Sequence, residues 1–427
     1  MSEYQGGEGE VVMLRSIELF TGAGGLALGT HRAGFHHLAV IERDSDSCET
    51  LRFNSARHVR TGVDWVVIEQ DVRHIHYATF ADTSVDLLVG GAPCQPFSIG
   101  GKHAGFADHR NMFPEVFRAM REIRPRAVLL ENVRGLIREN FKPYFDYLCD
   151  QLACPFIPPR ETEAWWDHAA RLRQELHVYR CNEQDTQYDV HVLPVNVADY
   201  GIPQERQRVF MVAFRRDLGV KWRFPAATHS VDALLYAQYV DGSYWREHNL
   251  SARHIPDRYV SRVARLARTG VPPLRRWRTV RDAIGDLPEP FDRVAHASIS
   301  NHIGIPDARI YPGHTGSPWD WPSKTIKAGD HGNPGGENML RYDDGSVRYF
   351  TVRELARLQT FPDEWQFAVS WSESRRQLGN AVPVMMAETL ARAIAVELKR
   401  APGHARLTPH EIGHDLSAVL PMVGLDE

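Results

Sequence analysis

Strand-like and helix-like segments alternate along residues 15–214. Short apolar runs, typical of buried strands, are separated by amphipathic segments long enough for helices. Parallel strands need a crossover that returns over the sheet, so the alternation predicts an α/β fold, a doubly wound and mostly parallel sheet with helices on both faces. Strands are expected at 16–20, 38–42, 66–71, 87–90 and 126–131, with a late pair at 188–195 and 208–214, and helices at 26–34, 44–54, 113–122 and 141–152.

The alternation stops near residue 218. Residues 219–345 are rich in Pro, Gly, Arg, Trp and His and have weak periodicity, which predicts a second, smaller and irregular domain. Helical periodicity then returns at 351–359 and 384–399. Three peripheral segments are also expected: a disordered lead-in at 1–14, a C-terminal tail at 403–427, and an insertion at 154–187 that contains an amphipathic helix at 163–176.

The composition carries no membrane, disulfide or metal signal. Hydrophobic residues make up 43% of the 427 residues and charged residues 24%, as in ordinary globular proteins. No apolar run approaches about 18 residues, and the acidic N-terminus is unlike a signal peptide. The five cysteines are odd in number and form no CxxC pair, and the 21 histidines form no HExxH. We therefore predict no disulfide framework, no bound metal and a cytoplasmic location.

Charge is distributed unevenly along the chain. The net charge is −4 overall, but residues 215–282 contain 14 Arg and Lys against 6 Asp and Glu, a local net charge of +8. A basic segment on an acidic body indicates a face that binds a polyanion such as nucleic acid, although a charge run is more often a solvated helix surface. Arg258, Arg262 and Arg265 have helical spacing and would share one face.

A cysteine follows the fourth predicted strand. The apolar run at 87–89 is followed by two glycines that allow a close turn, and residues 91–98 read G-A-P-C-Q-P-F-S. Ligands in open α/β sheets bind at the carboxyl ends of the strands. Cys94 is therefore a candidate nucleophile, and a buried structural cysteine is the alternative.

A glycine-rich loop follows the first predicted strand. Residues 20–25 read F-T-G-A-G-G and would let the backbone pass close to a ligand beside a helix N-terminus. The spacing is not GxGxxG, which counts against a dinucleotide oxidoreductase. Glu42 ends the second strand, where an acidic residue suits ribose hydroxyls, and Asp71 ends the third, where it suits an adenine amino group. These features indicate a nucleoside cofactor without a pyrophosphate, such as S-adenosylmethionine.

Six sequence blocks resemble those of the C5-cytosine DNA methyltransferase family, in the family's order. They are E-L-F-T-G-A-G-G at 18–25, G-A-P-C-Q-P-F-S at 91–98 with D-H-R at 108–110, E-N-V at 131–133, Q-E-R-Q-R at 204–208, the segment 348–362 with T-V-R-E and L-Q-T-F-P, and Q-L-G-N-A-V-P at 377–383. One block alone is weak evidence, but six in order are specific. The resemblance covers about residues 15–214 and 346–398, and it favours the bacterial modification-methylase type.

The resemblance implies a chemistry and assigns residues to it. Cys94 would add to carbon 6 of a flipped-out cytosine in a specific duplex DNA sequence, and Glu131, kept protonated by burial, would bond ring nitrogen 3. Methyl transfer from S-adenosylmethionine to carbon 5 would follow. Arg206 would hold the base, while Arg208 would orient the loop. The residues expected at the cofactor are Phe20, Gly22, Ala23, Gly24, Gly25, Glu42, Asp71, Val72, Pro93, Asn380 and Val382.

The resemblance also implies how the domains divide the work. Residues 15–218 and 346–402 would form the catalytic and cofactor-binding domain, a Rossmann-like methyltransferase fold, and 219–345 would form the target-recognition domain, with DNA between them. We expect a monomer that acts on nucleoid DNA in a prokaryotic cytoplasm, either in a restriction-modification system, whose endonuclease it would not contact, or in a related host-defence or epigenetic system. The expected DNA contacts, two of them in a glycine-rich lid after Cys94, are Gln95, Ser98, Gly100, Lys102, Arg110, Arg258, Arg262, Arg265 and Lys324.

Two other functions are compatible with parts of the sequence. One branch of the family methylates tRNA, but that branch has a Cys-Phe-Thr signature in its second domain, and residues 215–345 contain no cysteine. The second is a catalytically silent DNA-binding relative, against which the presence of Cys94, Glu131 and Arg206 argues. The DNA sequence that the protein recognises is not readable from any motif.

Overall fold

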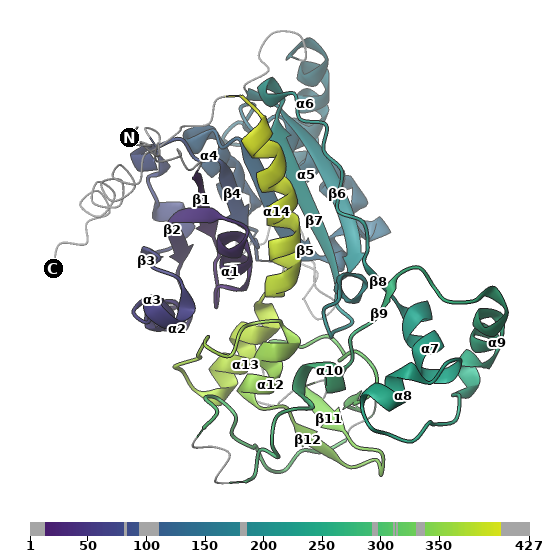
Figure 1. The fold of residues 1–427 in the computed structure, drawn as a ribbon. Coiled ribbons are helices and arrows are strands. Elements are labelled where there is room, and N and C mark those ends of the chain that lie inside the picture. Colours follow the sequence, from purple (N-terminus) through teal and green to yellow (C-terminus); the bar gives the residue numbers. More distant parts are fainter. Residues whose placement is uncertain are drawn as a thin grey trace, which may run out of the picture.

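Seven strands form one central sheet (Figure 1). The computed structural model describes residues 13–80, 83–93, 111–179, 186–292, 298–310, 312, 315–329 and 338–402. The expected lead-in, except its last two residues, and the expected tail lie outside these ranges. Among the described residues, no helix is both long and apolar enough to cross a membrane.

The sheet has the order β3-β2-β1-β4-β5-β7-β6. β7 runs antiparallel to both of its neighbours, and the other strand pairs are parallel. This arrangement confirms the predicted doubly wound, mostly parallel sheet. The strands are β1 (Leu14–Leu19), β2 (Phe35–Glu42), β3 (Val67–Glu69), β4 (Leu87–Gly90), β5 (Ala127–Val133), β6 (Tyr188–Asn196) and β7 (Gln207–Arg215).

Helices cover both faces of the sheet because the central strands are apolar on both sides. Leu88 on β4 and Val128 on β5 pack in one core with α4 (Phe113–Ile123) and α5 (Lys142–Ala153). Their neighbours Leu87 and Leu129 point to the other face and pack with α1 (Gly25–Arg32) and α14 (Val384–Arg400). Such double burial is what a parallel sheet requires.

The start of α14 therefore lies beside α1, although more than 350 residues separate them in sequence (Figure 1). Gly29 on α1 makes this close packing possible, since a Cβ there would lie 2.4 Å from the Cβ of Ala387. At the other end of α14, the buried Arg126 donates to the backbone oxygens of Leu398 and Pro402 and pairs with Asp86 at 2.7 Å. The C-terminal helix is thus fixed to the sheet at both ends.

The predicted insertion contains α6 (Trp165–Tyr179), close to its expected bounds. α6 packs on α5, where His168 and Tyr147 share a hydrogen bond of 2.9 Å. On the opposite edge of the sheet, α2 (Ser45–Ser55) begins at Asp44, whose side chain accepts from the backbone N–H of Ser47, and α3 (His58–Thr61) follows.

Residues 229–284 form a small lobe at one end of the molecule, whose last helix, at 280–284, packs against the main body (Figure 1). Its core includes Leu234, Tyr244, Trp245 and Trp277. This region is more regular than expected, because side-chain caps at Ser230 and Thr279 and the buried pair Val263 and Leu266 fix its helices. The elements are β8 (His229–Ser230), α7 (Val231–Tyr239), α8 (Ser243–Glu247), α9 (Val260–Thr269), β9 (Arg275–Arg276) and α10 (Val280–Ile284).

Part of the segment expected as a second domain shares a core with the first. Val280, Ile326 and Leu340 pack with Leu28 of α1 and Trp65. The same core receives two later helices, α12 (Val352–Leu358) and α13 (Trp371–Asn380), of which α13 was not expected. A small sheet lies beside them, consisting of β10 (Ser317–Pro318), β11 (Met339–Arg341) and β12 (Val347–Tyr349).

Candidate active site

The sequence blocks meet at the carboxyl edge of the central sheet. The strand order reverses between β1 and β4, and there Leu19 pairs with Gly90, which in turn pairs with Leu130. The glycine loop and the residues before Cys94 therefore follow β1 and β4, and Glu131 lies near the end of the adjacent β5 at the same level. Ligands of open α/β sheets bind at such a switch point.

The glycines of the loop serve different purposes. A Cβ on Gly25 would lie 2.3 Å from the carbonyl oxygen of Val382, and one on Gly24 would lie 2.9 Å from the Leu51 side chain. These two glycines allow close packing. A Cβ on Gly22 would meet nothing within 4 Å, although the backbone there has a left-handed φ of +56°. Gly22 therefore leaves free space beside the backbone, as a loop that receives a ligand needs.

Glu42 holds the glycine loop in place. One carboxylate oxygen accepts from the backbone N–H of Gly22 at 2.8 Å, and the other accepts from the N–H groups of Arg43 and Asp44. The expected ribose-binding residue therefore contacts the loop directly. Phe20 has a positive φ of 58° and packs partly into the core, and Ala23 is buried.

Asp71 is ionised and flanked by two arginines. Its carboxylate accepts from Nε and Nη2 of Arg73 at 2.9 and 2.7 Å and lies 3.3 Å from Arg43. The hydrogen bonds from Arg73 hold the pKa of Asp71 well below its usual range. Val72 follows in a short turn and is buried. The strand ends at Glu69, two residues earlier than expected, and Asp71 caps the turn that follows, with its charge compensated by protein groups.

Glu18 on β1 is a buried acid to which the sequence analysis gave no role. It is fully buried, and neither carboxyl oxygen has a hydrogen-bond partner among the described residues. Burial raises its pKa well above the usual value; the backbone of Ala27 opposes this effect, although it forms no hydrogen bond of normal geometry with the carboxyl group. A buried carboxyl group without a partner is unfavourable, and a cationic ligand could supply the missing partner. Its sequence signal was a lone acid within an apolar strand before a glycine loop.

The nucleophile segment is described only up to Pro93. The side chain of Asn132 on β5 donates to the carbonyl oxygen of Ala92 at 3.1 Å and so fixes the approach to this segment. Cys94 and the expected DNA contacts Gln95, Ser98, Gly100, Lys102 and Arg110 lie outside the described residues. Gly91 borders Glu131, because a Cβ on it would lie 3.7 Å from the Glu131 carboxylate.

Glu131 and Arg208 form an ion pair. Nε of Arg208 lies 2.7 Å from the Glu131 carboxylate, and the side chains are only 12% and 11% exposed. The pairing of β5 with β7 brings them together, since Val133 is opposite Arg208 and Glu131 is two residues away on the same strand. The sequence analysis expected Glu131 as a buried acid without a cationic partner, and the structure places it opposite the Arg208 guanidinium.

The two arginines of the Q-E-R-Q-R block occupy the reverse of their expected positions. Arg206, expected to hold the base, is 1% exposed and donates to the backbone oxygens of Ile326, Gly379 and Ala381 at 2.8 to 3.0 Å. Arg208, expected to orient the loop, contacts Glu131. The physical reason is strand register: Arg206 precedes β7 and points into the protein, while Arg208 lies within β7 beside the edge of the site.

Arg206 thereby connects the last sequence block to the rest of the site. Gln359 assists by donating to the backbone oxygens of Leu378 and Ala381. Of the two expected cofactor residues in this block, Val382 is buried and Asn380 is exposed. Pro93 is partly exposed.

The arginines expected at DNA differ in their surroundings. Arg262 and Arg265 lie on one face of α9 as predicted, but both pair with Asp232 of α7, so their charges are partly compensated. Arg258 is exposed and lies over the Tyr259 ring at 4.7 Å. Nζ of Lys324 donates to the Thr315 hydroxyl at 2.9 Å.

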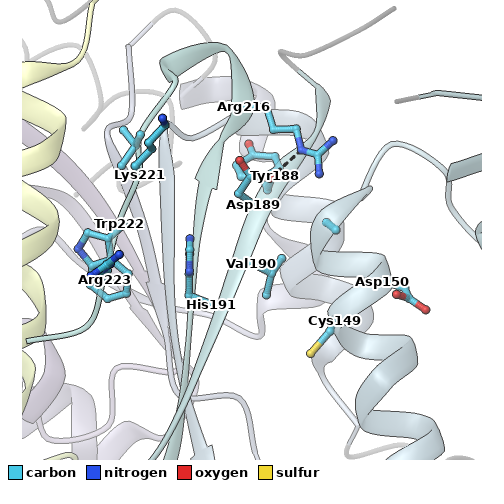
Figure 2. A pocket seen from close by; sticks show the side chains of 12 residues that line it. Cys149, Asp150, Tyr188, Asp189, Val190, His191, Arg216, Lys221, Trp222 and Arg223 are labelled. Atoms are coloured by element: carbon cyan, nitrogen blue, oxygen red, sulfur yellow. Dashed lines mark hydrogen bonds and ion pairs between the residues drawn. The ribbon is translucent and has the colours of Figure 1, made fainter. Parts of the chain in front are cut away.

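One cavity lies away from these blocks, beside the first half of β6 (Figure 2). It has a volume of about 610 Å³ and is lined in part by Cys149, His191 and Trp222. Arg216 pairs with Asp189 at 2.8 Å beside it. Burial raises the pKa of Cys149 to about 12, which keeps its thiol protonated and unreactive. The cavity therefore has no part in the candidate site.

A cluster of two acids and a histidine also lies outside the candidate site. Glu247, His248 and Asp282 bring potential metal-ligand atoms within 4.8 Å of one another. Arg276 pairs with both carboxylates, and Asp282 also caps α10. These acids already have structural partners within the lobe, and the predicted absence of a metal remains a prediction.

Comparison with known proteins identifies the family. The model of the C-5 cytosine-specific DNA methylase family matches residues 14–154 and 169–396. The chain belongs to this family. It is a DNA (cytosine-5)-methyltransferase, in agreement with the sequence analysis.

Bacterial relatives of this family match almost the whole chain. Type II methyltransferase M.Eco47II of Escherichia coli is 32% identical over 88% of this chain and 78% of its own length. Type II methyltransferase M.NgoMIV of Neisseria gonorrhoeae is also 32% identical, over 90% of this chain and 98% of its own.

Solved structures show the same methyltransferase fold. A putative DNA modification methyltransferase encoded within an E. coli prophage has a TM-score of 0.53 at 21% identity and covers 90% of this chain and 99% of its own. The S. pombe Dnmt2 methyltransferase has a TM-score of 0.53 at 17% identity and covers 91% and 99%.

Proposed function

We propose that this methyltransferase modifies carbon 5 of a cytosine flipped out of a specific duplex DNA sequence, with S-adenosylmethionine as methyl donor and Cys94 as covalent nucleophile. The observation that carries the proposal is the Glu131–Arg208 pair, which borders Gly91 three residues before Cys94. A nucleophile, an acid and a cation would then meet at the carboxyl edge of the sheet.

The chemistry explains why these groups belong together. Carbon 5 of cytosine is a poor nucleophile until the Cys94 thiolate bonds carbon 6, breaks the ring's aromaticity and makes carbon 5 enamine-like. Negative charge that develops toward ring nitrogen 3 is stabilised by a hydrogen bond from Glu131 in its acid form, which keeps its proton when the ring is restored, and by the Arg208 guanidinium beside it. After methylation, loss of the carbon 5 proton to water and cleavage of the sulfur–carbon 6 bond restore the ring and release Cys94.

The residues around the glycine loop fit S-adenosylmethionine, which when bound supplies an electrophilic methyl group. Gly22 leaves space for close approach, and Glu42 stands beside it for the ribose hydroxyls. Asp71, two residues after the end of β3, is assigned to the adenine amino group. The unpartnered carboxyl of Glu18 offers an acceptor for a cationic group. The other residues assigned to this site are Phe20, Ala23, Gly24, Gly25, Val72, Pro93, Asn380 and Val382.

The DNA substrate follows from the same chemistry. A thiol cannot reach carbon 6 of a stacked base, so the cytosine must leave the duplex. We assign its recognition to residues 219–345, with Arg258 as the contact best placed by its exposure. One set of blocks per chain is consistent with a monomer. The type II relatives support a role in a restriction-modification system of a prokaryotic cell, with an endonuclease that does not contact this chain.

The test is transfer of labelled methyl groups from S-adenosylmethionine to unmethylated bacterial DNA and, in parallel, to tRNA. We expect label on DNA with the intact protein and none with Cys94→Ala. Sequencing of the modified cytosines would reveal the recognition sequence. Label on tRNA alone would overturn the DNA assignment, and absence of label on both despite measurable cofactor binding would favour a silent DNA-binding relative.

A further inference from the structure

The segment 317–326 lies between the small lobe and the Q-E-R-Q-R block. On one side, the backbone N–H groups of Val280 and Arg281 donate to the carbonyl oxygens of Trp321 and Trp319 at 3.0 and 2.9 Å. On the other side, the N–H of Glu205 donates to the Ser323 oxygen at 2.7 Å. The segment is thus the strip of backbone through which the lobe contacts residues 203–206.

Trp321 contacts both sides with its side chain. Its ring stacks on Tyr259 with centroids 5.3 Å apart and planes at 18°, and the exposed Arg258 lies over both rings, at 4.7 and 6.0 Å. Its indole N–H donates to the Glu205 carboxylate at 2.5 Å. An indole offers one donor in a fixed direction, so the position of the ring determines that of the Glu205 carboxylate.

Glu205 transmits this contact to the catalytic pair. It lies within the Q-E-R-Q-R block, immediately before Arg206 and three residues before Arg208. Its backbone is held by Ser323 and by the Thr325 hydroxyl, which donates to the Glu205 oxygen at 2.7 Å. Arg206 is held by three backbone oxygens. A shift of Glu205 would therefore be passed along the chain to the start of β7, the strand that carries Arg208.

We propose that Trp321 is a positioning residue that couples target recognition in the small lobe to the Glu131–Arg208 pair. DNA that binds the exposed face of Arg258 would fix the position of the Tyr259–Trp321 stack. The indole N–H of Trp321 would then fix the Glu205 carboxylate and, with it, the start of β7. DNA of the wrong sequence would leave the stack unsupported and the pair misaligned. This inference rests on the proposed roles of Glu131 and Arg208.

The decisive variant is Trp321→Phe, which keeps the aromatic stack and removes the N–H donor. We expect kcat on cognate DNA to fall by roughly ten-fold or more, while the Kd for DNA stays within about two-fold. The rate on cognate DNA divided by the rate on singly mismatched DNA should also decrease. Trp166→Phe, an equal change on the exposed face of α6, is the matched control and should leave both quantities unchanged.

Variants of Glu205 keep the test informative if Trp321→Phe folds poorly. Glu205→Ala should reproduce the fall in kcat, Glu205→Gln, which retains an acceptor oxygen, should restore most of it, and the double variant with Trp321→Phe should be no slower than Glu205→Ala. The coupling would be overturned if Trp321→Phe had an unchanged kcat, or weakened DNA binding alone, and Glu131→Gln were inactive as the proposed function requires. An active Glu131→Gln enzyme would instead overturn the proposed function.

Discussion

Arg208 on β7 and Glu131 on β5 are joined by a 2.7 Å ion pair at the edge of the site. We assign the Arg208 guanidinium two roles. It fixes the Glu131 carboxyl group, and it opposes the negative charge that develops on the base. Replacing either partner should therefore affect catalysis more than cofactor binding.

The two arginines of the block should behave differently on substitution. Arg208→Ala should lower kcat by roughly a hundred-fold or more, since it removes a charge that acts in the transition state, with little change in melting temperature. Arg206→Ala should instead destabilise the fold by about 3 kcal/mol or more, because it removes the donor to three buried carbonyl oxygens, of which only that of Ala381 keeps another, from Gln359. Steady-state kinetics and urea unfolding separate the two effects. An Arg206→Ala protein of full stability would contradict this assignment.

Two glycines should separate cofactor binding from folding. Gly22→Ala meets no atom within 4 Å, so its cost to stability should be only about 1 kcal/mol from the left-handed backbone, yet its methyl group would fill the space left for the cofactor. Calorimetry should therefore show weakened binding of S-adenosylmethionine. Gly29→Ala, whose Cβ would collide with Ala387, should mainly lower stability. Unchanged affinity in Gly22→Ala would place the cofactor elsewhere.

The Arg126–Asp86 pair should be important for the C-terminal helix. Both side chains are buried, so Arg126→Ala leaves an uncompensated carboxylate and should cost about 3–5 kcal/mol in the free energy of unfolding. The double variant with Asp86→Ala should be less damaging than the sum of the single changes, because it removes both charges. Additive losses in a double-mutant cycle would mean that the pair does not couple.

His37 should make stability depend on pH. Burial lowers its pKa to about 3, against about 6.5 in the unfolded chain, with His31 and His36 adding small effects in the same direction. The folded state thus holds His37 neutral, so its contribution is complete above about pH 6.5 and is lost as the pH falls toward 3, at up to about 1.4 kcal/mol per pH unit.

The stability advantage of the native protein over His37→Gln should accordingly shrink between pH 7 and pH 5. Guanidinium unfolding at several pH values measures this difference. A difference that stays constant over the range would show that His37 does not titrate abnormally.

Much of the central sheet was predictable because its strands and helices are regular. Each apolar run that became a strand was flanked by turn residues, and helices such as α14 carry a strong apolar period. α13 was missed because its sequence, W-S-E-S-R-R-Q-L-G-N, is mostly polar and is fixed by the Ser370 cap rather than by a stripe of apolar residues.

The roles within the site depend on relations that a sequence does not contain. Arg206 and Arg208 are two residues apart and chemically identical, so only the register of β7 against β5 distinguishes the buried one from the one at Glu131. Likewise, the helical spacing of Arg262 and Arg265 was correct, but their common partner Asp232 lies on a different helix. Glu18 stood in a recognised block, and only its burial showed that its carboxyl lacks a partner.

The central claim is that Cys94 attacks cytosine, and DNA with 5-fluorocytosine in place of cytosine tests it most directly. With fluorine in place of hydrogen, carbon 5 carries no proton that can be removed. The enzyme should therefore stay bonded to carbon 6 after methyl transfer. We predict a covalent complex on a denaturing gel that requires S-adenosylmethionine, maps to the peptide with Cys94, and is absent in Cys94→Ala. A wild-type enzyme that methylates ordinary DNA but forms no such complex, or forms it at another residue, would contradict the account.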